Sequence, residues 1–214
     1  GYEYVRDRQP VDRAIEEYLA DPVEHMLLTW RNSLRMTANK AIRARLGHDG
    51  PLPDDGEPVL IKKNGQGHLN GEIVPCGGFE AGPTVGSLRT LWMRVGTYAR
   101  LLVTVDGGDR EKGGEMFDGQ QPWIVDWKRY HIDLQQKCLP EPLPLTWGYV
   151  HTAHSAQGSE ARRVTVFLER GDERSSHFRK KLTLPDKTAT SFAARFIYTA
   201  MTRSVKYTLL FVGR

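Results

Sequence analysis

The spacing of apolar residues changes along the chain and predicts its first elements. Apolar positions recur at helical spacing in 11–20, and 24–30 is a nearly continuous apolar run. This pattern predicts a short helix followed by a buried strand. Helical spacing then returns in 31–46, where the apolar positions are Leu34, Ala38, Ile42 and Leu46. Helix, strand and helix in this order indicate an α/β fold with a largely parallel sheet.

The pattern changes near residue 47. From there to about residue 114 the chain is rich in glycine and turn signals, and short β-type runs lie at 58–63, 68–74, 88–95 and 98–105. The turn dipeptides are Asn64-Gly65, Asn70-Gly71 and Asp106-Gly107. Short strands joined by such turns predict a small β-barrel inserted into the α/β domain.

A proline-rich stretch at 139–144 is interpreted as the return linker from this barrel. The α/β pattern then resumes with predicted strands at 146–152, 164–169 and 207–212 and a helix at 190–204. We therefore expect a host domain made of 1–46 and 140–214. Residues 47–139 are expected to form the inserted barrel and its linker.

The composition is typical of a globular protein and does not by itself indicate a function. Hydrophobic residues make up 39% of the chain, no apolar run is long enough to cross a bilayer, and no secretory signal opens the sequence. We expect a cytoplasmic protein that does not enter a membrane. The formal net charge of +4 permits a nucleic-acid partner without demonstrating one.

Charge is unevenly distributed along the chain. Residues 31–46 hold five basic side chains and no acid, and Arg35, Asn39 and Arg43 lie four apart. In a helix these three side chains share one stripe. The stripe is either a solvated face or a surface that contacts DNA.

Two segments carry recognisable chemistry. Residues 152–160 read Thr-Ala-His-Ser-Ala-Gln-Gly-Ser-Glu, so a strand end is followed by small and hydroxyl residues, a glycine and a carboxylate. Backbone amides and hydroxyls at such a turn suit phosphate, and a carboxylate suits a ribose hydroxyl. Residues 198–203 read Tyr-Thr-Ala-Met-Thr-Arg and close a helix with an arginine, whose planar donors match a γ-phosphoryl group. An ordinary polar turn and an arginine favoured by the helix dipole are the simpler alternatives.

Taken in order, these segments resemble the second motor domain of superfamily 1 DNA helicases. Residues 28–32 (Leu-Thr-Trp-Arg-Asn) resemble helicase motif IV, 152–160 resemble motif V, and 198–203 resemble motif VI. The Gln-Gly-Ser-Glu form at 157–160 is closer to the RecD-like, 5′-to-3′ branch. His68-Leu69-Asn70-Gly71-Glu72 resembles a hairpin of the SH3-like barrel that this branch inserts.

The resemblance implies a RecA-like parallel sheet with helices on both faces, interrupted by a small SH3-like β-barrel. It also implies a role for individual residues. Arg203 would act as the arginine finger on the γ-phosphate, and Arg31 would be a second γ-phosphate contact. The implied ATP-binding residues are Glu160 at the ribose, Gly158, Gln157, and Trp30 near the adenine. The implied DNA-binding residues are Thr152, His154, Ser155, Thr29, Asn39 and Arg43.

The sequence contains no G-x-x-x-x-G-K-[ST] phosphate loop, and no metal-binding site is predicted in it. ATP with Mg²⁺ is therefore expected to be bound mainly by a preceding RecA-like domain of the same protein, which this chain lacks, so the chain alone should be inactive. Single-stranded DNA is the expected track. Two alternatives stay open at this point: a nucleic-acid-binding module without motor activity, and an RNA helicase of the same superfamily.

Overall fold

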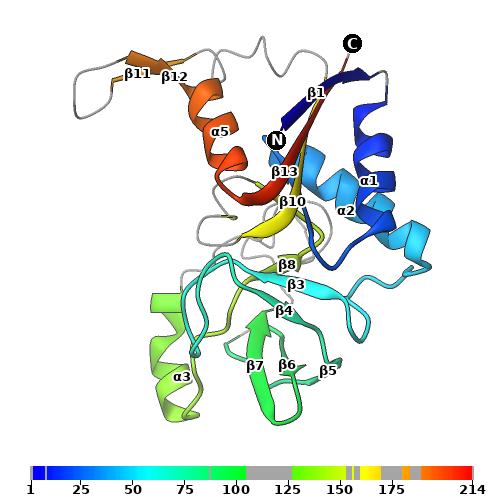
Figure 1. Ribbon diagram of the computed structural model, residues 1–214. Coiled ribbons are helices and arrows are strands. Elements are labelled where there is room, and N and C mark those ends of the chain that lie inside the picture. The colour runs from blue at the N-terminus through cyan, green and yellow to red at the C-terminus, as the bar shows by residue number, and fades with distance from the viewer. Residues whose placement is uncertain are drawn as a thin grey trace. The chain divides into compact units, whose positions relative to one another are not determined.

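The protein is described by a computed structural model (Figure 1). The described residues are 2–7, 9–86, 88–104, 127–152, 156, 160–169, 180–183 and 189–213. The chain divides into two compact units, one made of Gly1–Ala38 and Val150–Arg214 and the other of Asn39–Tyr149. The second unit is therefore an insertion between two parts of the first.

The first unit is built on a five-stranded sheet in which every neighbouring pair of strands is parallel. The strand order is β1-β13-β10-β2-β9. The strands are β1 (Tyr2–Asp7), β2 (His25–Thr29), β9 (Val150–Thr152), β10 (Ala161–Leu168) and β13 (Ser204–Gly213). The fold of this unit is thus α/β with a parallel sheet, as expected, and it gains an edge strand, β1, that the apolar pattern did not predict.

The central strands owe their position to continuous burial. All five residues of β2 are buried, and so are the last five of β10. A run that is buried on both faces is typical of an inner strand of a parallel sheet covered by helices. His25 is tolerated there because its Nε2 lies 2.7 Å from Thr165 Oγ1 and its Nδ1 lies 3.1 Å from the Glu17 carbonyl oxygen.

Helices follow the strands of this unit. Helix α1 (Pro10–Ala20) begins with a proline, which has no N–H to leave unsatisfied at that position, and buries Ala14 and Ile15. Helix α5 (Phe192–Met201) begins after Ser191, whose hydroxyl accepts a hydrogen bond from the Ala194 amide at 3.0 Å. Helix α2 (Asn32–Leu46) starts in the first unit and ends in the second. A short hairpin of β11 (Lys181–Thr183) and β12 (Ala189–Ser191) precedes α5.

The second unit contains two antiparallel three-stranded sheets. One has the order β4-β3-β8, and the other has the order β5-β6-β7. The strands are β3 (Pro58–Ile61), β4 (Ile73–Pro75), β5 (Phe79–Ala81), β6 (Thr90–Val95), β7 (Ala99–Thr104) and β8 (Leu145–Trp147). A 3-10 turn, η1 (Trp127–Tyr130), and helix α3 (His131–Gln136) follow the second sheet. The two sheets are linked near Leu143, whose amide donates to the Leu102 carbonyl oxygen at 2.9 Å.

The return to the first unit differs from the sequence prediction. Residues 146–152 were expected to form one strand of the host domain, but they form two short strands that belong to different units. β8 pairs with β3, whereas β9 pairs with β2. Between them the Gly148 amide donates to the Pro58 carbonyl oxygen at 2.8 Å, and a Cβ on Gly148 would lie 3.0 Å from the Pro58 carbonyl carbon. This close backbone contact separates the two strands, so the first unit resumes at residue 150 and the proline-rich stretch lies inside the second unit.

Candidate nucleotide and nucleic-acid site

Glu160 and Arg203 lie at the same edge of the parallel sheet. Glu160 is exposed and directly precedes β10, and Arg203 directly precedes β13. The Ala161 amide donates to the Arg203 carbonyl oxygen at 2.9 Å, and Ala161 is in register with Ser204. Two segments 43 positions apart in the sequence therefore bring a carboxylate and a guanidinium to the amino ends of two adjacent strands.

Helix α5 sets the position of Arg203. The helix ends at Met201, and the Arg203 amide donates to the Ala200 carbonyl oxygen at 3.2 Å, so the arginine sits in the turn between the helix and β13. Ala200 and Phe196 of this helix pack in one buried cluster with Ala156, a residue of the segment 152–160. The two segments that resemble motifs V and VI are thus joined through the core of the first unit.

The opposite edge of the sheet holds another group of predicted site residues. Thr29 ends β2, Thr152 ends β9, and these two residues are in register. Trp30 follows β2, is half-buried, and contacts the Phe196 ring edge-on with 5.7 Å between ring centroids. Arg31 forms an ion pair with Glu169, the residue that follows β10. The carboxyl ends of the strands therefore gather Thr152 and Arg31 on one side.

The structure does not bring Arg31 and Arg203 together, so the expectation that both contact one γ-phosphate is corrected. They lie at opposite ends of β10. The Arg203 carbonyl oxygen accepts a hydrogen bond from Ala161, the first residue of β10, whereas Arg31 forms an ion pair with Glu169, the residue after the end of the strand. The strand has eight residues and spans roughly 23 Å at the usual rise. This separation exceeds the reach of two arginine side chains placed end to end.

Three residues predicted to contact DNA are buried. Thr29 has no exposed surface. Its hydroxyl donates to the Phe167 carbonyl oxygen at 3.1 Å, so this side chain links β2 to β10 within the sheet. Asn39 is also fully buried, and Arg43 is only 4% exposed. The DNA contacts inferred for these residues are corrected, because none offers its polar atoms to a ligand at the surface.

Arg43 is held by protein partners. Its guanidinium donates to both carboxylate oxygens of Glu57 at 2.8 and 2.9 Å, and to the carbonyl oxygens of Gly50 and Leu52 at 2.7 and 3.0 Å. It also stacks 4.7 Å from the centroid of the Trp147 ring. These partners compensate the burial of the Arg43 guanidinium, because a buried charge without hydrogen-bonding and ionic partners lowers the stability of the fold. We interpret the arrangement as a clamp that fixes the end of α2 within the second unit.

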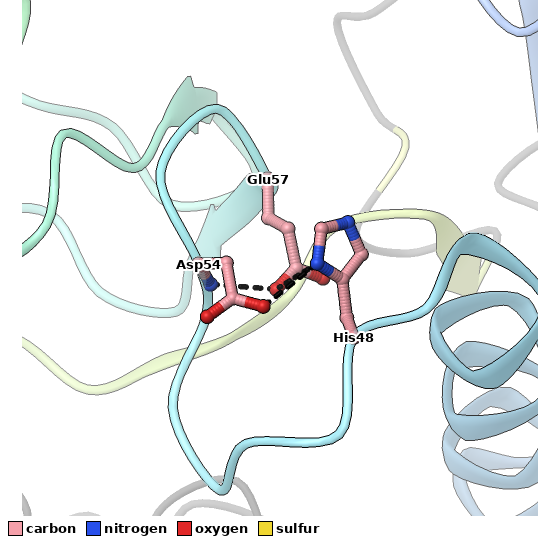
Figure 2. Close-up of side chains that lie close together, drawn as sticks. All are labelled: His48, Asp54 and Glu57. Carbon is pink, nitrogen blue, oxygen red and sulfur yellow. Dashed lines mark hydrogen bonds and ion pairs between the residues drawn. The ribbon is translucent and has the colours of Figure 1, made fainter.

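Figure 2 shows a cluster next to this clamp that has the donor types of a metal site. His48, Asp54 and Glu57 each offer one ligand atom, and these atoms lie within 4.8 Å of one another. His48 Nδ1 lies 2.7 Å from Asp54 Oδ2, and Glu57 Oε2 accepts from the Asp54 amide at 2.6 Å. Both Glu57 oxygens already accept hydrogen bonds from Arg43, and Oε1 also accepts one from the Tyr149 hydroxyl at 2.8 Å. A cation could reach Glu57 only by displacing Arg43, so the cluster completes the clamp.

The segment that resembles the Asn-Gly-Glu hairpin is an ordered turn beside β3. Gly71 adopts a φ of +94°, and its amide donates to the Ile61 carbonyl oxygen at 2.8 Å. Glu72 accepts from the Leu69 amide at 2.9 Å and contacts His68 Nδ1 at 2.9 Å. The hydrogen bonds with the Leu69 amide and with His68 lower the pKa of the Glu72 carboxyl from its usual value.

Four predicted site residues lie outside the described part of the chain: His154, Ser155, Gln157 and Gly158. The ion-pair partners Glu57 and Glu169 were not predicted as such, because their arginines are 14 and 138 positions away and nothing local in the sequence connects them.

Comparison with known proteins finds matches among solved structures. No protein-family model matches the sequence, and no curated protein matches it. Among solved structures, the chain is similar to Pif1 helicase from Candida albicans, with a TM-score of 0.42 and 13% sequence identity. The similarity covers 95% of this chain and 53% of that one, so the chain spans about half the length of the helicase structure. None of the helices in the described ranges has the length and hydrophobicity that crossing a membrane requires.

Proposed function

We propose that this chain is the second RecA-like motor domain of a superfamily 1 DNA helicase of the RecD-like, 5′-to-3′ branch, with an SH3-like barrel as its inserted unit. One observation carries the proposal. Glu160, the carboxylate of the motif V-like segment, and Arg203, the arginine of the motif VI-like segment, lie at one edge of a parallel sheet, where the Ala161 amide next to Glu160 donates to the Arg203 carbonyl oxygen.

The edge with Glu160 and Arg203 is the proposed nucleotide edge. Glu160 accepts a hydrogen bond from a ribose hydroxyl, which its exposed position allows. Arg203 stabilises the charge that develops on the γ-phosphoryl group during hydrolysis, for which its fixed charge and planar donors are suited. The remaining phosphate contacts and Mg²⁺ are assigned to a preceding RecA-like domain, since this sequence has no phosphate loop.

The edge with Thr152 and Arg31 is the proposed strand edge. A hydroxyl and a guanidinium suit phosphates of single-stranded DNA, and such contacts carry no sequence preference. Thr152 and Glu160 are eight positions apart in the sequence but lie at opposite ends of the strands, since one ends β9 and the other precedes β10. The segment between them therefore links the strand edge to the nucleotide edge, which is the connection that coupling translocation to hydrolysis needs.

The test is ATP turnover by the full-length protein with Arg203 replaced. Arg203→Ala should lower the maximal rate about 10³-fold, the range for arginine fingers, while nucleotide affinity changes much less. Arg203→Lys should recover little, because an ammonium cannot reproduce the planar fork. Arg13→Ala, an exposed substitution in α1, is the matched control. Near-normal turnover in Arg203→Ala would contradict the assignment.

A further inference from the structure

Arg31 and Glu169 form an ion pair at the strand edge of the parallel sheet. Arg31 lies two positions after the end of β2, and Glu169 directly follows the end of β10, which is the neighbouring strand. Both are inner strands of the sheet. The pair therefore lies between the carboxyl ends of two inner strands.

The chain leaves the carboxyl ends of β2 and β10 in opposite directions. After β2 the next strand of this sheet is β9, on one side, whereas after β10 it is β13, on the other side. Helix α5 covers one face of these strands and α1 covers the other (Figure 1). In open α/β sheets, ligands bind outside the carboxyl ends of the strands, at the point where the connections diverge. The Arg31–Glu169 pair lies at that point of this sheet.

The ion pair contributes little to the stability of the fold. The side chains of Arg31 and Glu169 are 42% and 47% exposed, and ion pairs at such exposed positions add little or nothing to the free energy of unfolding. The pair is also not required to hold β2 against β10, because all five residues of β2 are already in register with β10. Its two side chains can therefore exchange partners at little cost to the fold.

A phosphate group and the Glu169 carboxylate would compete for the same guanidinium. The planar donors of Arg31 suit a phosphate and a carboxylate in the same way. A phosphate that approaches Arg31 has to displace the Glu169 carboxylate, and the two negative charges repel each other. The contact between Arg31 and a phosphate is weakened as a result. A weak contact can pass from one phosphate to the next, which movement along a strand requires.

We propose that Glu169 competes with the phosphates of single-stranded DNA for Arg31 and so lowers the affinity of the strand edge for DNA. The inference rests on the proposed function, which supplies the strand edge and its ligand. It adds a regulating residue to that edge, because Glu169 lies outside the segments that resemble helicase motifs.

The test is binding of fluorescent oligothymidylate to the full-length protein without nucleotide, followed by anisotropy over a range of salt concentrations. Glu169→Gln should tighten binding about three- to fivefold at low salt, because the amide keeps the size of the side chain and removes the competing charge. The gain should shrink as the salt concentration rises. The slope of log affinity against log salt should steepen by up to about 0.7, because in the parent protein the displaced carboxylate takes up a cation that offsets the one released from the phosphate.

Glu24→Gln is the matched control. Glu24 forms an ion pair with Arg162 in which the side chains are 46% and 48% exposed, but this pair lies at the opposite end of β10. The control removes the same charge and should change neither the affinity nor its salt dependence. Unfolding midpoints of both variants should stay close to that of the parent, since both carboxylates are exposed. Equal tightening in Glu24→Gln would show an effect of net charge alone and would overturn the proposal.

A double variant shows whether Glu169 acts through Arg31. Arg31→Ala should weaken oligothymidylate binding, because it removes a phosphate contact. Glu169→Gln added to Arg31→Ala should give a much smaller gain than it gives in the parent protein, because the guanidinium for which the two groups compete is absent. The same gain in both backgrounds would show that Glu169 acts by repulsion alone and would overturn the proposal.

The combined results distinguish this inference from the proposed function. If Arg31→Ala weakens binding while Glu169→Gln binds like the parent or more weakly, the competition is overturned and the strand edge is unaffected. If Arg31→Ala binds like the parent, the strand edge is contradicted, and the competition with it. The last arm measures a fluorescent, non-hydrolysable ATP analogue, whose affinity Glu169→Gln should leave unchanged. Tighter binding of this analogue with unchanged strand binding would identify a nucleotide phosphate as the ligand of Arg31 and would overturn the proposal.

Discussion

Buried charge decides the local structure around Glu57. Burial by itself raises the pKa of the Glu57 carboxyl, but hydrogen bonds from Arg43, the Asp54 amide and Tyr149 outweigh burial, so the pKa lies below its usual value. The ionised carboxylate therefore stabilises the fold fully above the unfolded-state pKa of about 4.3. That contribution is lost as the pH falls from there through the folded-state pKa.

Glu57→Gln should destabilise the second unit by about 3–5 kcal/mol at neutral pH, because the substitution leaves the Arg43 guanidinium buried without its counter-charge. The variant should also lose the part of the acid-induced destabilisation that comes from Glu57. Chemical denaturation at several pH values measures both effects. Asp55→Asn, a neighbouring exposed acid, should change the free energy of unfolding by less than about 0.5 kcal/mol. A Glu57→Gln variant as stable as the parent would show that the clamp is not a structural feature of the fold.

The same residues show where sequence reasoning failed at this scale. Arg35, Asn39 and Arg43 do share a helical stripe, but all three are buried. Periodicity identifies which residues share a face and cannot identify what covers that face. The partner of Arg43, Glu57, directly precedes β3. The sequence around Glu57 has no pattern that predicts a buried carboxylate at this position.

At the scale of elements, helices and strands with strong apolar patterns were predicted closely. The expected helix at 11–20 is α1 (Pro10–Ala20), and the expected strand at 24–30 is β2 (His25–Thr29). Three-residue strands such as β5 and β9 are too short to show a period. The division of 145–152 between two sheets depends on the contact of Gly148 with Pro58, which no pattern within that segment reveals.

The order of the strands places Arg31 at the strand edge and not at the nucleotide edge, and this placement can be tested. In the full-length protein, Thr152→Ala and Arg31→Ala should each raise the concentration of single-stranded DNA that half-maximally stimulates ATP turnover, because both residues lie at the strand edge. Arg203→Ala should instead lower the maximal rate. Titrating ATPase activity with oligothymidylate at fixed, saturating ATP separates the two effects. If Arg31→Ala lowered the maximal rate as Arg203→Ala does, the division of the sheet into two edges would be wrong.

At the scale of the whole molecule, the sequence predicted an α/β unit interrupted by a small β-barrel. The structure contains an α/β unit with a second unit inserted in it, and this second unit has two antiparallel three-stranded sheets. The boundaries moved to 39 and 149 because helix α2 and strand β8 contribute to the inserted unit. What remains a proposal is the function of the first unit as a motor domain with a nucleotide edge and a strand edge.

Strand separation by the full-length protein tests the central claim most directly. The substrates are one duplex with a 5′ single-stranded tail and a matched duplex with a 3′ tail, each carrying a fluorophore and a quencher at the blunt end. The account predicts ATP-dependent separation of the 5′-tailed duplex by the parent protein and none by Arg203→Ala. Separation of the 3′-tailed duplex alone would contradict the assigned polarity. Failure to separate either duplex with ATP present would contradict the assignment of this chain as a helicase motor domain.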